Sequence, residues 1–504
     1  MKIPNTPAAS VLSMAIGFSI VGACSSGRVS TFDSGTGSGT AGSSSGSPGA
    51  GGSAPAGGTL TGMIGIPGGT TGAGGSGSGT PHPCVNLECQ KTNCTLGACQ
   101  QMPCANGAKT TLSGIVYDPA GKVPLYNVIV YVPNAEPAPF AAGATCDRCS
   151  TNSLNSVAAA LTDTHGHFVL NDVPVGSDIP LVIQIGKWRR QVKLPSVARC
   201  VDTPVEAALT HLPRNKAEGD IPLIAITTGG ADSMECLPLR MGIDPAEFTT
   251  ETGNGRLHLY FGQDSTVDIS TKSFDATLNG GAMLSQAPAL WNSVDTMKKY
   301  DIVILSCEGA LNPQEKLPPA RQALYDYASA GGRVFASHWH HLWFSGGPAP
   351  VPQIATWRDL RDPIDPSIGI INTTFPKGQA MSEWLVNVGA STMPGQLEIH
   401  APRDNVTRVN ATMATEWIKL QNVGQTVEFL SFNAPLGAAD DMLCGRAIYS
   451  DLHVSSTTGD TPGTPFPASC VKGDLSAQEK ALEFMLFDLS SCVTPDDKPP
   501  PPPR

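Results

Sequence analysis

The sequence predicts a multidomain protein in which a β-sandwich precedes a doubly wound α/β domain, both following a disordered Gly/Ser tether. Three observations support this order. Residues 25–82 are rich in Gly, Ser, Thr, Ala and Pro, a composition that cannot bury enough apolar surface to fold. Residues 109–215 alternate short β-rich runs with Asp, Gly and Pro turns, which favours an antiparallel sandwich. Residues 219–493 alternate continuous apolar runs with helical segments, which is typical of a parallel sheet covered by helices.

The N-terminus has the pattern of an export signal. An apolar stretch, residues 11–21, is too short for a stable membrane span but has the size of a signal-peptide core. The run Val21-Gly22-Ala23-Cys24 that follows resembles the bacterial lipoprotein signal, with a signal peptide over residues 1–24. The resemblance implies acylation of Cys24 and anchoring in a membrane of the cell envelope, and the lack of an Asp after Cys24 favours the outer membrane. An ordinary secretory signal with an incidental Cys is the alternative.

Two low-complexity segments flank the folded part. Residues 25–82 would form a tether with a root-mean-square reach of about 40 Å, and the Pro-rich residues 494–504 predict a frayed tail. Roughly 390 residues remain for two or three domains. The net charge of −11 is spread without a basic block, so we expect no nucleic-acid partner.

Fourteen cysteines in an exported chain predict disulfide bonds. Without Cys24 thirteen remain, so one thiol would be free or would pair between chains. We interpret residues 83–108 as a small disulfide-bonded stalk, with a metal cluster as the alternative. The cysteines of this segment recur every fifth residue: Cys84, Cys89, Cys94, Cys99 and Cys104.

The other cysteines fall in the two predicted domains. Cys146 and Cys149 form a Cys-x-x-Cys that could be redox-active, but its loop lacks the helix N-terminus that lowers a thiol pKa. We therefore expect them to bond to Cys200 or to the stalk. Cys236 and Cys307 follow two strands that would be neighbours, and a disulfide between them is one candidate pairing.

The C-terminal cysteines suggest a staple around the last helix. Cys470 and Cys492 bracket that predicted helix, so a bond between them would fix the C-terminus. Cys444 competes as a partner for either of them.

The sandwich carries motifs of a known family. The runs "LSGIVYDPAGKVPLYNVIVYVPN" and "TDTHGHFVLNDVPVG" resemble the carboxypeptidase-regulatory-like, transthyretin-type domain. The resemblance covers about a hundred residues within residues 109–215. It implies a seven-stranded structural or adhesive module rather than a catalyst.

The α/β domain is predicted from its alternating elements. Strands are expected at residues 221–226, 257–261, 301–306, 334–337, 426–431 and 447–450, and helices at residues 315–330 and 477–489, with a possible helical segment reaching Met241. This rhythm predicts a doubly wound, flavodoxin-like sheet whose ligands bind at the carboxyl ends of the strands.

Three segments resemble the class I glutamine amidotransferase-like superfamily and, within it, the ThuA-like branch: "YDIVILSCEG", "ALYDYASAGGRVFASHWHH" and "GRAIYSDLHVSS". The resemblance implies a nucleophilic Cys on an elbow, a late His, and an acid two positions beyond that His. His453 matches the late His, but Ser455 replaces the acid and the elbow reads Ser337-His338-Trp339-His340. Cys307 matches a position that is not the nucleophile. Amide hydrolysis by the usual mechanism is therefore not expected, and the ThuA-like branch, which has a His near the elbow, fits better.

The candidate site consists of imidazoles. Alternation along an extended chain predicts that His338 and His340 share one side and that His341 faces the other. With His453 they would suit Zn²⁺ or another divalent transition metal, and His338, His340 and His453 are also the candidate catalytic residues. A structural role under a loop is the alternative.

Other side chains near the imidazoles are candidates for supporting roles. Trp339 and Trp343 would suit stacking on a sugar ring. Four acids could act as metal or base partners or could be ordinary turn residues: Asp301, Asp440, Asp441 and Asp451.

Two functional classes follow. The first is a non-enzymatic envelope lipoprotein that binds a carbohydrate or protein ligand. The second is a ThuA-like or hydrolase-type enzyme that acts on an extracytoplasmic sugar or amide substrate with His453 and His338 or His340. The elbow without Cys favours the first class.

Overall fold

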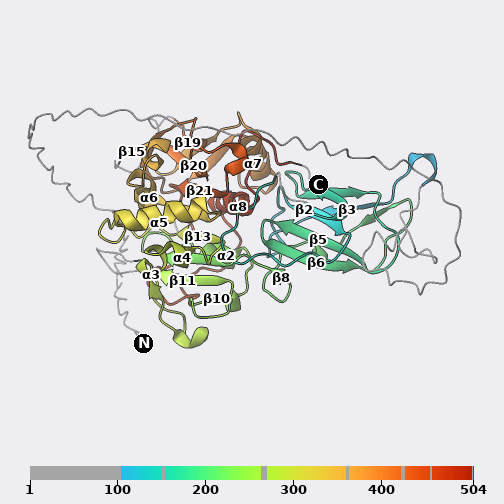
Figure 1. Ribbon diagram of the computed structural model, residues 1–504, viewed down its shortest axis with the longest axis horizontal. Coiled ribbons are helices and arrows are strands. Elements are labelled where there is room, and N and C mark those ends of the chain that lie inside the picture. The colour runs from blue at the N-terminus through green and yellow to red at the C-terminus, as the bar shows by residue number, and fades with distance from the viewer. Residues whose placement is uncertain are drawn as a thin grey trace, which may run out of the picture. The chain divides into compact units, whose positions relative to one another are not determined.

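The computed structural model describes residues 104–149, 154–262, 270–358, 363–421, 426–454, 457–501 and 503. These residues belong to one compact unit, Cys84–Arg504, which consists mostly of β-sheet (Figure 1). The predicted lipidation site Cys24, the tether and the first four stalk cysteines lie outside the described residues. No described helix has the length and apolar composition needed to cross a membrane.

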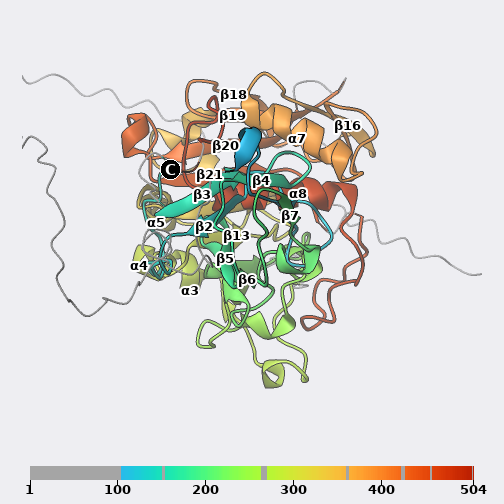
Figure 2. The ribbon, with the colours of Figure 1, turned by 90° about the vertical axis from the view of Figure 1, so that its right-hand side faces the viewer.

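The N-terminal sandwich contains two sheets. One has the strand order β3-β2-β5-β6-β8 and the other the order β4-β1-β7 (Figures 1 and 2). The predicted runs become β1 (Thr111–Ile115), β2 (Ile129–Pro133), β4 (His167–Asn171) and β5 (Ile179–Ile185). Four strands were not predicted: β3 (Ser156–Leu161), β6 (Trp188–Leu194), β7 (Asp202–Pro204) and β8 (Gly219–Asp220). In β4 the apolar side chains Phe168 and Leu170 are buried while their neighbours are exposed, as expected for a half-buried strand.

The C-terminal part is built on one large sheet. Among the described residues its main path runs β10-β11-β9-β13-β14-β21-β20-β19-β16-β17. The parallel half contains β9 (Ile224–Thr228), β10 (Phe248–Thr249), β11 (Leu257–Phe261), β13 (Ile302–Leu305), β14 (Arg333–Ser337) and β21 (Gly445–Ser450), and β12 (Ser285–Gln286) pairs with β11. The antiparallel half contains β16 (Ser367–Ile371), β17 (Gln396–Ile399), β19 (Thr415–Leu420) and β20 (Val427–Ala434). The six predicted strands are all present, but the run at residues 426–431 pairs antiparallel.

Helices cover this sheet (Figure 1). The two predicted ones are α5 (Pro318–Ser329) and α8 (Ala477–Ser490), and the segment to Met241 forms α2 (Cys236–Arg240). Helix α8 begins with a capping box in which Ser476 and Glu479 satisfy each other's backbone N–H groups. The other described α-helices are α3 (Pro288–Trp291), α4 (Val294–Met297), α6 (Leu342–Ser345) and α7 (Pro376–Asn387), and β15 (Ala355–Trp357) and β18 (Val406–Val409) form a separate two-stranded antiparallel sheet.

Aromatic side chains of α8 also contact the sandwich. The Phe487 ring lies 5.9 Å from that of Trp188, and the Phe484 ring lies 5.9 Å from that of Tyr126. Aromatic pairs at this distance contribute about 0.5–1.5 kcal/mol beyond their burial. The last helix therefore packs against both parts of the compact unit.

The disulfides within the described residues differ from the expected pairings. Cys236 bonds to Cys470, and Cys307 forms no disulfide there, so the expected Cys236–Cys307 bond is wrong. Cys492 bonds to Cys149 instead of Cys470, so the expected staple around the last helix is also wrong.

The Cys-x-x-Cys motif is split between two distant partners. Cys146 bonds to Cys444 and Cys149 bonds to Cys492. Cys200 pairs with the stalk residue Cys104, so the expectation that Cys200 pairs with the motif is wrong. Both cysteines of the motif join the sandwich covalently to the α/β part, which is a structural rather than a redox arrangement.

The C-terminal tail is ordered where it is described. Asp496 has an exposed fraction of 8 % and lies 2.8 Å from the Arg446 guanidinium, and its other oxygen accepts a hydrogen bond from the Ser431 hydroxyl. The Asn433 amide donates to the carbonyl of Thr494. The expected frayed tail is therefore wrong for this segment, because an ion pair draws the chain back onto the sheet.

Candidate functional site

Three candidate ligand residues meet at the carboxyl edge of the parallel strands. Cys307 lies two residues after β13, His338 directly follows β14, and His453 lies three residues after β21. One ligand atom of each residue lies within 4.8 Å of the others. Their exposed fractions are 0 %, 3 % and 2 %, so the group lies below the surface.

The strand register explains why these residues meet. Leu305 of β13 pairs with Ala336 of β14, so Cys307 and His338 each stand two residues beyond this pair. Ser337 pairs with Ser450 of β21, so His338 stands one residue and His453 three residues beyond that pair. Because parallel strands end at a common edge, the residues that follow them are brought level with one another.

His338 occupies a strained elbow. Its φ is 43°, in the left-handed region that residues other than Gly rarely adopt. The chain passes at this point from β14 into a 3₁₀-helix, His338–His341. The turn brings the His338 Nδ1 to 3.3 Å from the Cys307 sulfur, and the His338 and His453 ring centroids lie 5.1 Å apart.

The two imidazoles of this group are neutral at physiological pH. Burial lowers the pKa of His338 and that of His453 well below the usual range, and the nearby positive charge of Arg403 lowers both further. A neutral imidazole keeps a lone pair, which is the form that a metal ion binds.

His340 is separated from this group. The 3₁₀-helix replaces the extended chain that placed it beside His338 in the sequence-based expectation. Its Nε2 donates to the carbonyl of Ser306 at 2.7 Å, and its Nδ1 accepts the Trp343 indole N–H at 2.8 Å. Both ring nitrogens are thus occupied, and no atom is left to ligate a metal or to transfer a proton.

The expected aromatic platform is also incomplete. Trp343 is 2 % exposed and lies 5.2 Å from the Trp291 ring, so it belongs to the core rather than to a ligand surface. Trp339 is half-buried, and its ring lies 4.9 Å from that of His338. His341 stacks on Trp357 and bonds to the Ser345 hydroxyl, away from the cysteine.

The four candidate acids have different places. Asp301 lies at the opposite end of β13, where it forms an ion pair with Lys187. Asp440 and Asp441 are exposed in a 3₁₀ turn. Asp451 alone lies beside the ligand group, since it directly follows β21.

Asp451 is held in a buried hydrogen-bond network. The Tyr449 hydroxyl lies 2.7 Å from its Oδ1 and 3.0 Å from the carbonyl oxygen of His338, while the Asn405 backbone N–H donates to its Oδ2. Burial raises the pKa of Asp451 to about 7, although the hydrogen bonds from Tyr449 and Asn405 oppose the rise. Burial beside Asp451 also raises the pKa of Glu428 well above its usual range.

Asp232 is a supporting residue that sequence reasoning missed. Its carboxylate accepts the Ser337 hydroxyl at 2.9 Å and the Val454 N–H at 2.7 Å. It thereby ties the residue before His338 to the residue after His453. Its position after the first buried strand, at the edge where ligands bind, was the signal that could have identified it.

One separation within the group is close to that in a tetrahedral metal site, and the three ligand atoms lie within 4.8 Å of one another. With Zn–S and Zn–N bonds of about 2.3 and 2.05 Å, a tetrahedral zinc ion would separate its sulfur and nitrogen ligands by about 3.6 Å. The observed separation of Cys307 Sγ and His338 Nδ1 is 3.3 Å. One thiolate and two imidazoles form a soft donor set that selects transition metals over Mg²⁺ or Ca²⁺.

Comparisons with known proteins give only weak likenesses. No protein-family model matches the sequence, and no curated protein matches it. A crystal structure of a ThuA-like protein from Bacteroides uniformis is similar over 47 % of this chain and 84 % of that chain, with 12 % identity and a TM-score of 0.25. Two type II cohesin–X-dockerin complexes from Acetivibrio cellulolyticus cover 27 % of this chain and 85 % of theirs, with 16 % identity and a TM-score of 0.16. The first likeness is compatible with a ThuA-like domain, but scores at this level carry no argument.

Proposed function

We propose that the α/β domain binds one divalent transition-metal ion, Zn²⁺ being the first candidate, through Cys307, His338 and His453. The observation that carries the proposal is the convergence of these three donor atoms within 4.8 Å. Three protein ligands leave a fourth position for water or for a ligand, as in catalytic zinc sites. Such an ion would act as a Lewis acid and would lower the pKa of a water molecule bound to it.

Two uses of such a site remain open to experiment. In the first, the domain binds a carbohydrate or protein ligand without transforming it. In the second, it is a ThuA-like or hydrolase-type enzyme for an extracytoplasmic sugar or amide. The open fourth position favours the second use, as do Asp451 and Tyr449, which lie beside the ligands and could exchange a proton with a substrate.

The fold assignments belong to the same proposal. The flavodoxin-like, doubly wound assignment is supported by the strand order β11-β9-β13-β14-β21, in which β11 lies outside β9, the first strand of the large sheet. The transthyretin-type assignment of the sandwich is supported by its antiparallel five-stranded sheet, which is accompanied by a three-stranded sheet in which β1 pairs antiparallel with β4 and parallel with β7.

The cellular address is also a proposal. The lipoprotein-like run at Cys24 suggests a lipid anchor on the outer membrane. The four disulfides among the described residues support an oxidising compartment, because such bonds persist outside the cytoplasm.

Metal analysis of the purified full chain tests the metal site. We expect one equivalent of metal per chain, and a cobalt-substituted protein should show a thiolate-to-cobalt charge-transfer band. Cys307→Ser should remove that band, and His453→Ala should reduce the metal content. His340→Gln is the matched control and should keep both, since His340 already bonds to protein atoms through both nitrogens. A correctly folded protein that takes up no Zn²⁺ or Co²⁺ would refute the proposal.

A further inference from the structure

His453 lies on a long loop that connects β21 to α8. The segment between Ser450 and Ala477 contains no described helix or strand. Connections of more than about 12–15 residues without secondary structure are uncommon in compact domains. A metal ligand on such a segment must be held in place by other contacts.

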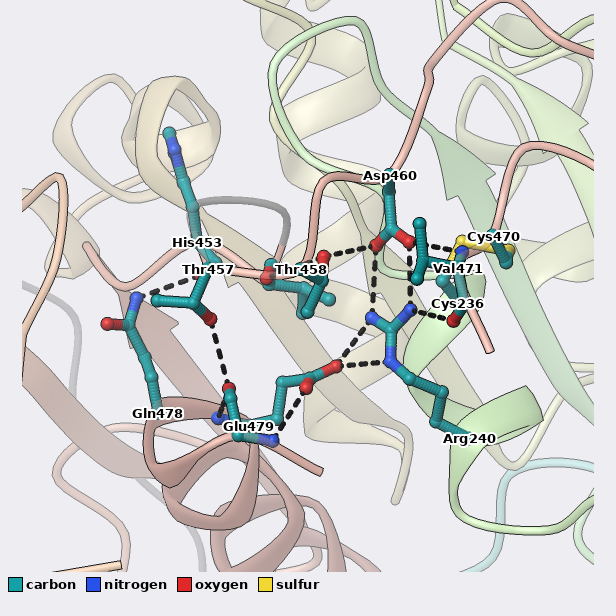
Figure 3. Close-up of polar contacts among 12 residues, drawn as sticks. Cys236, Arg240, His453, Thr457, Thr458, Asp460, Cys470, Val471, Gln478 and Glu479 are labelled. Carbon is teal, nitrogen blue, oxygen red and sulfur yellow. Dashed lines mark hydrogen bonds and ion pairs between the residues drawn. A yellow bond between two sulfur atoms is a disulfide. The ribbon is translucent and has the colours of Figure 1, made fainter. Parts of the chain in front are cut away.

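Arg240 of α2 supplies one group of these contacts (Figure 3). Its Nε donates to the Glu479 carboxylate at 2.6 Å, and its Nη2 lies 2.5 Å from the same oxygen in an ion pair. Nη1 and Nη2 each donate to one oxygen of Asp460, at 2.9 and 3.0 Å, and Nη1 also donates to the carbonyl of Val471. Four hydrogen bonds and this ion-pair contact therefore involve all three nitrogens of the guanidinium.

The acceptors of Arg240 lie on two structural elements. Asp460 and Val471 belong to the loop, whereas Glu479 lies in the first turn of α8. The side chains of Arg240, Asp460 and Glu479 have exposed fractions of 3 %, 0 % and 0 %. Asp460 also accepts the backbone N–H of Val471 at 2.7 Å, so the two loop segments are joined to each other as well as to α2.

A covalent bond reinforces the same contact. Cys236, four residues before Arg240 and therefore on the same face of α2, forms a disulfide with Cys470 of the loop. Figure 3 shows this disulfide beside the Arg240 ion cluster. Helix α2 thus holds the loop at Asp460 and at residues 470–471.

Helix α8 links the contacts of Arg240 to His453. The Gln478 amide, adjacent to Glu479, donates to the His453 carbonyl oxygen at 2.8 Å. On the other side, the N–H of Val454 donates to Asp232. In Figure 3 the His453 imidazole points away from Gln478 and from the ion cluster, so the backbone is fixed while the ring stays directed to the site.

We propose that Arg240 is a positioning residue for the metal site, which it serves by fixing the loop and helix that hold His453. The inference rests on the metal binding proposed above. Metal ligands must be held to within about 0.5 Å of their bound geometry. Loss of residues that orient a ligand typically weakens metal binding 10- to 100-fold. We expect an effect of this size when the contacts of Arg240 are removed.

The test uses the metal-free full chain, titrated with Co²⁺ and with Zn²⁺ against a competing chelator. Arg240→Met alone would leave two buried carboxylates without their cation, so the main variant is Arg240→Met combined with Asp460→Asn and Glu479→Gln. We expect this triple variant to bind Co²⁺ about 10- to 100-fold more weakly than wild type. Its cobalt spectrum should retain the thiolate band of Cys307 and change in the ligand-field region, where loss of an imidazole is visible.

Two further variants separate positioning from folding. Asp496→Asn lowers stability at the opposite end of β21 and should leave the cobalt affinity unchanged. Arg240→Lys keeps the positive charge but cannot reproduce the four hydrogen bonds of the guanidinium, so it should fold and bind Co²⁺ more weakly than wild type. Wild-type affinity in both the triple variant and Arg240→Lys would overturn this inference and leave the metal site intact. Absence of metal binding in wild type would instead overturn the proposed function.

Discussion

Asp496→Asn tests whether the C-terminal tail stabilises the fold through its buried ion pair. Burial alone would raise the pKa of Asp496, but the positive charges of Arg446 and Lys377 outweigh it and lower that pKa to about 2. The unperturbed value is 3.8. The difference corresponds to about 2 kcal/mol of stability at neutral pH, at about 1.36 kcal/mol per pKa unit.

The sign of the pH dependence follows from the lowered pKa. A carboxyl group whose pKa falls on folding stabilises the protein above its unfolded pKa and loses that effect as the pH falls through the folded value. The contribution of Asp496 should therefore be complete at pH 7 and fall to roughly half of that at pH 3. The stability difference between wild type and Asp496→Asn should shrink accordingly.

Thermal unfolding at matched scan rates is the assay. For a folded region of roughly 400 residues, about 2 kcal/mol corresponds to a fall in Tm of about 2 °C if the unit unfolds cooperatively. Asp497→Asn is the matched control, because Asp497 is adjacent and exposed; it should change the unfolding free energy by less than about 0.5 kcal/mol. Equal Tm values for the two variants at pH 7 would refute the docked tail.

Two other substitutions test close contacts and ion pairs of the fold. Gly331→Ala should destabilise by more than Gly389→Ala in thermal unfolding. Both glycines have positive φ, but a Cβ at Gly331 would lie 2.3 Å from the Thr145 carbonyl oxygen, whereas one at Gly389 would meet no atom within 4 Å. Lys187→Met should cost about 3 kcal/mol, because it leaves Asp301, whose side chain is 9 % exposed, without its cation. Lys109→Met removes an ion pair whose side chains are more than half exposed and should cost less than about 1 kcal/mol; equal losses would contradict the buried pair.

The parallel half of the sheet could be predicted because its strands are continuous apolar runs. Each such run is buried on both faces, so its composition alone marks it as a central strand. The antiparallel half lacks this mark: β16 is interrupted by Gly369, and β19 mixes Glu416 and Lys419 with apolar residues. The formation of these strands depends on pairing with other strands that are distant in sequence.

The disulfide pairing could not be predicted for a related reason. Cys146 and Cys444 are separated by 298 residues, and Cys149 and Cys492 by 343. Their pairing depends on how the sandwich packs against the α/β part, which no local pattern encodes. The odd number of cysteines indicated that one thiol would lie outside the intrachain disulfides, but nothing in the sequence identified the buried Cys307 as that residue.

The candidate site was predicted in part. The resemblance to the amidotransferase-like superfamily identified His338 and His453, and the structure brings these two together with Cys307. His340 was included in the predicted site because the side-chain alternation of an extended strand was assumed to continue past the end of β14. Alternation holds only while the chain stays extended, and at His338 the backbone turns into a 3₁₀-helix, in which residues i and i+3 rather than i and i+2 share a side.

The strain at His338 gives a further way to separate function from stability. Ala is ordinarily better tolerated than Gly, because Gly loses more conformational entropy on folding. At φ 43° the order should reverse, since Gly adopts this region without steric cost. His338→Gly should therefore be more stable than His338→Ala by about 1 kcal/mol, although both lack the imidazole and should bind metal equally poorly. If His338→Ala proves the more stable of the two, the elbow is not strained, and the backbone would no longer explain how this imidazole reaches the Cys307 sulfur.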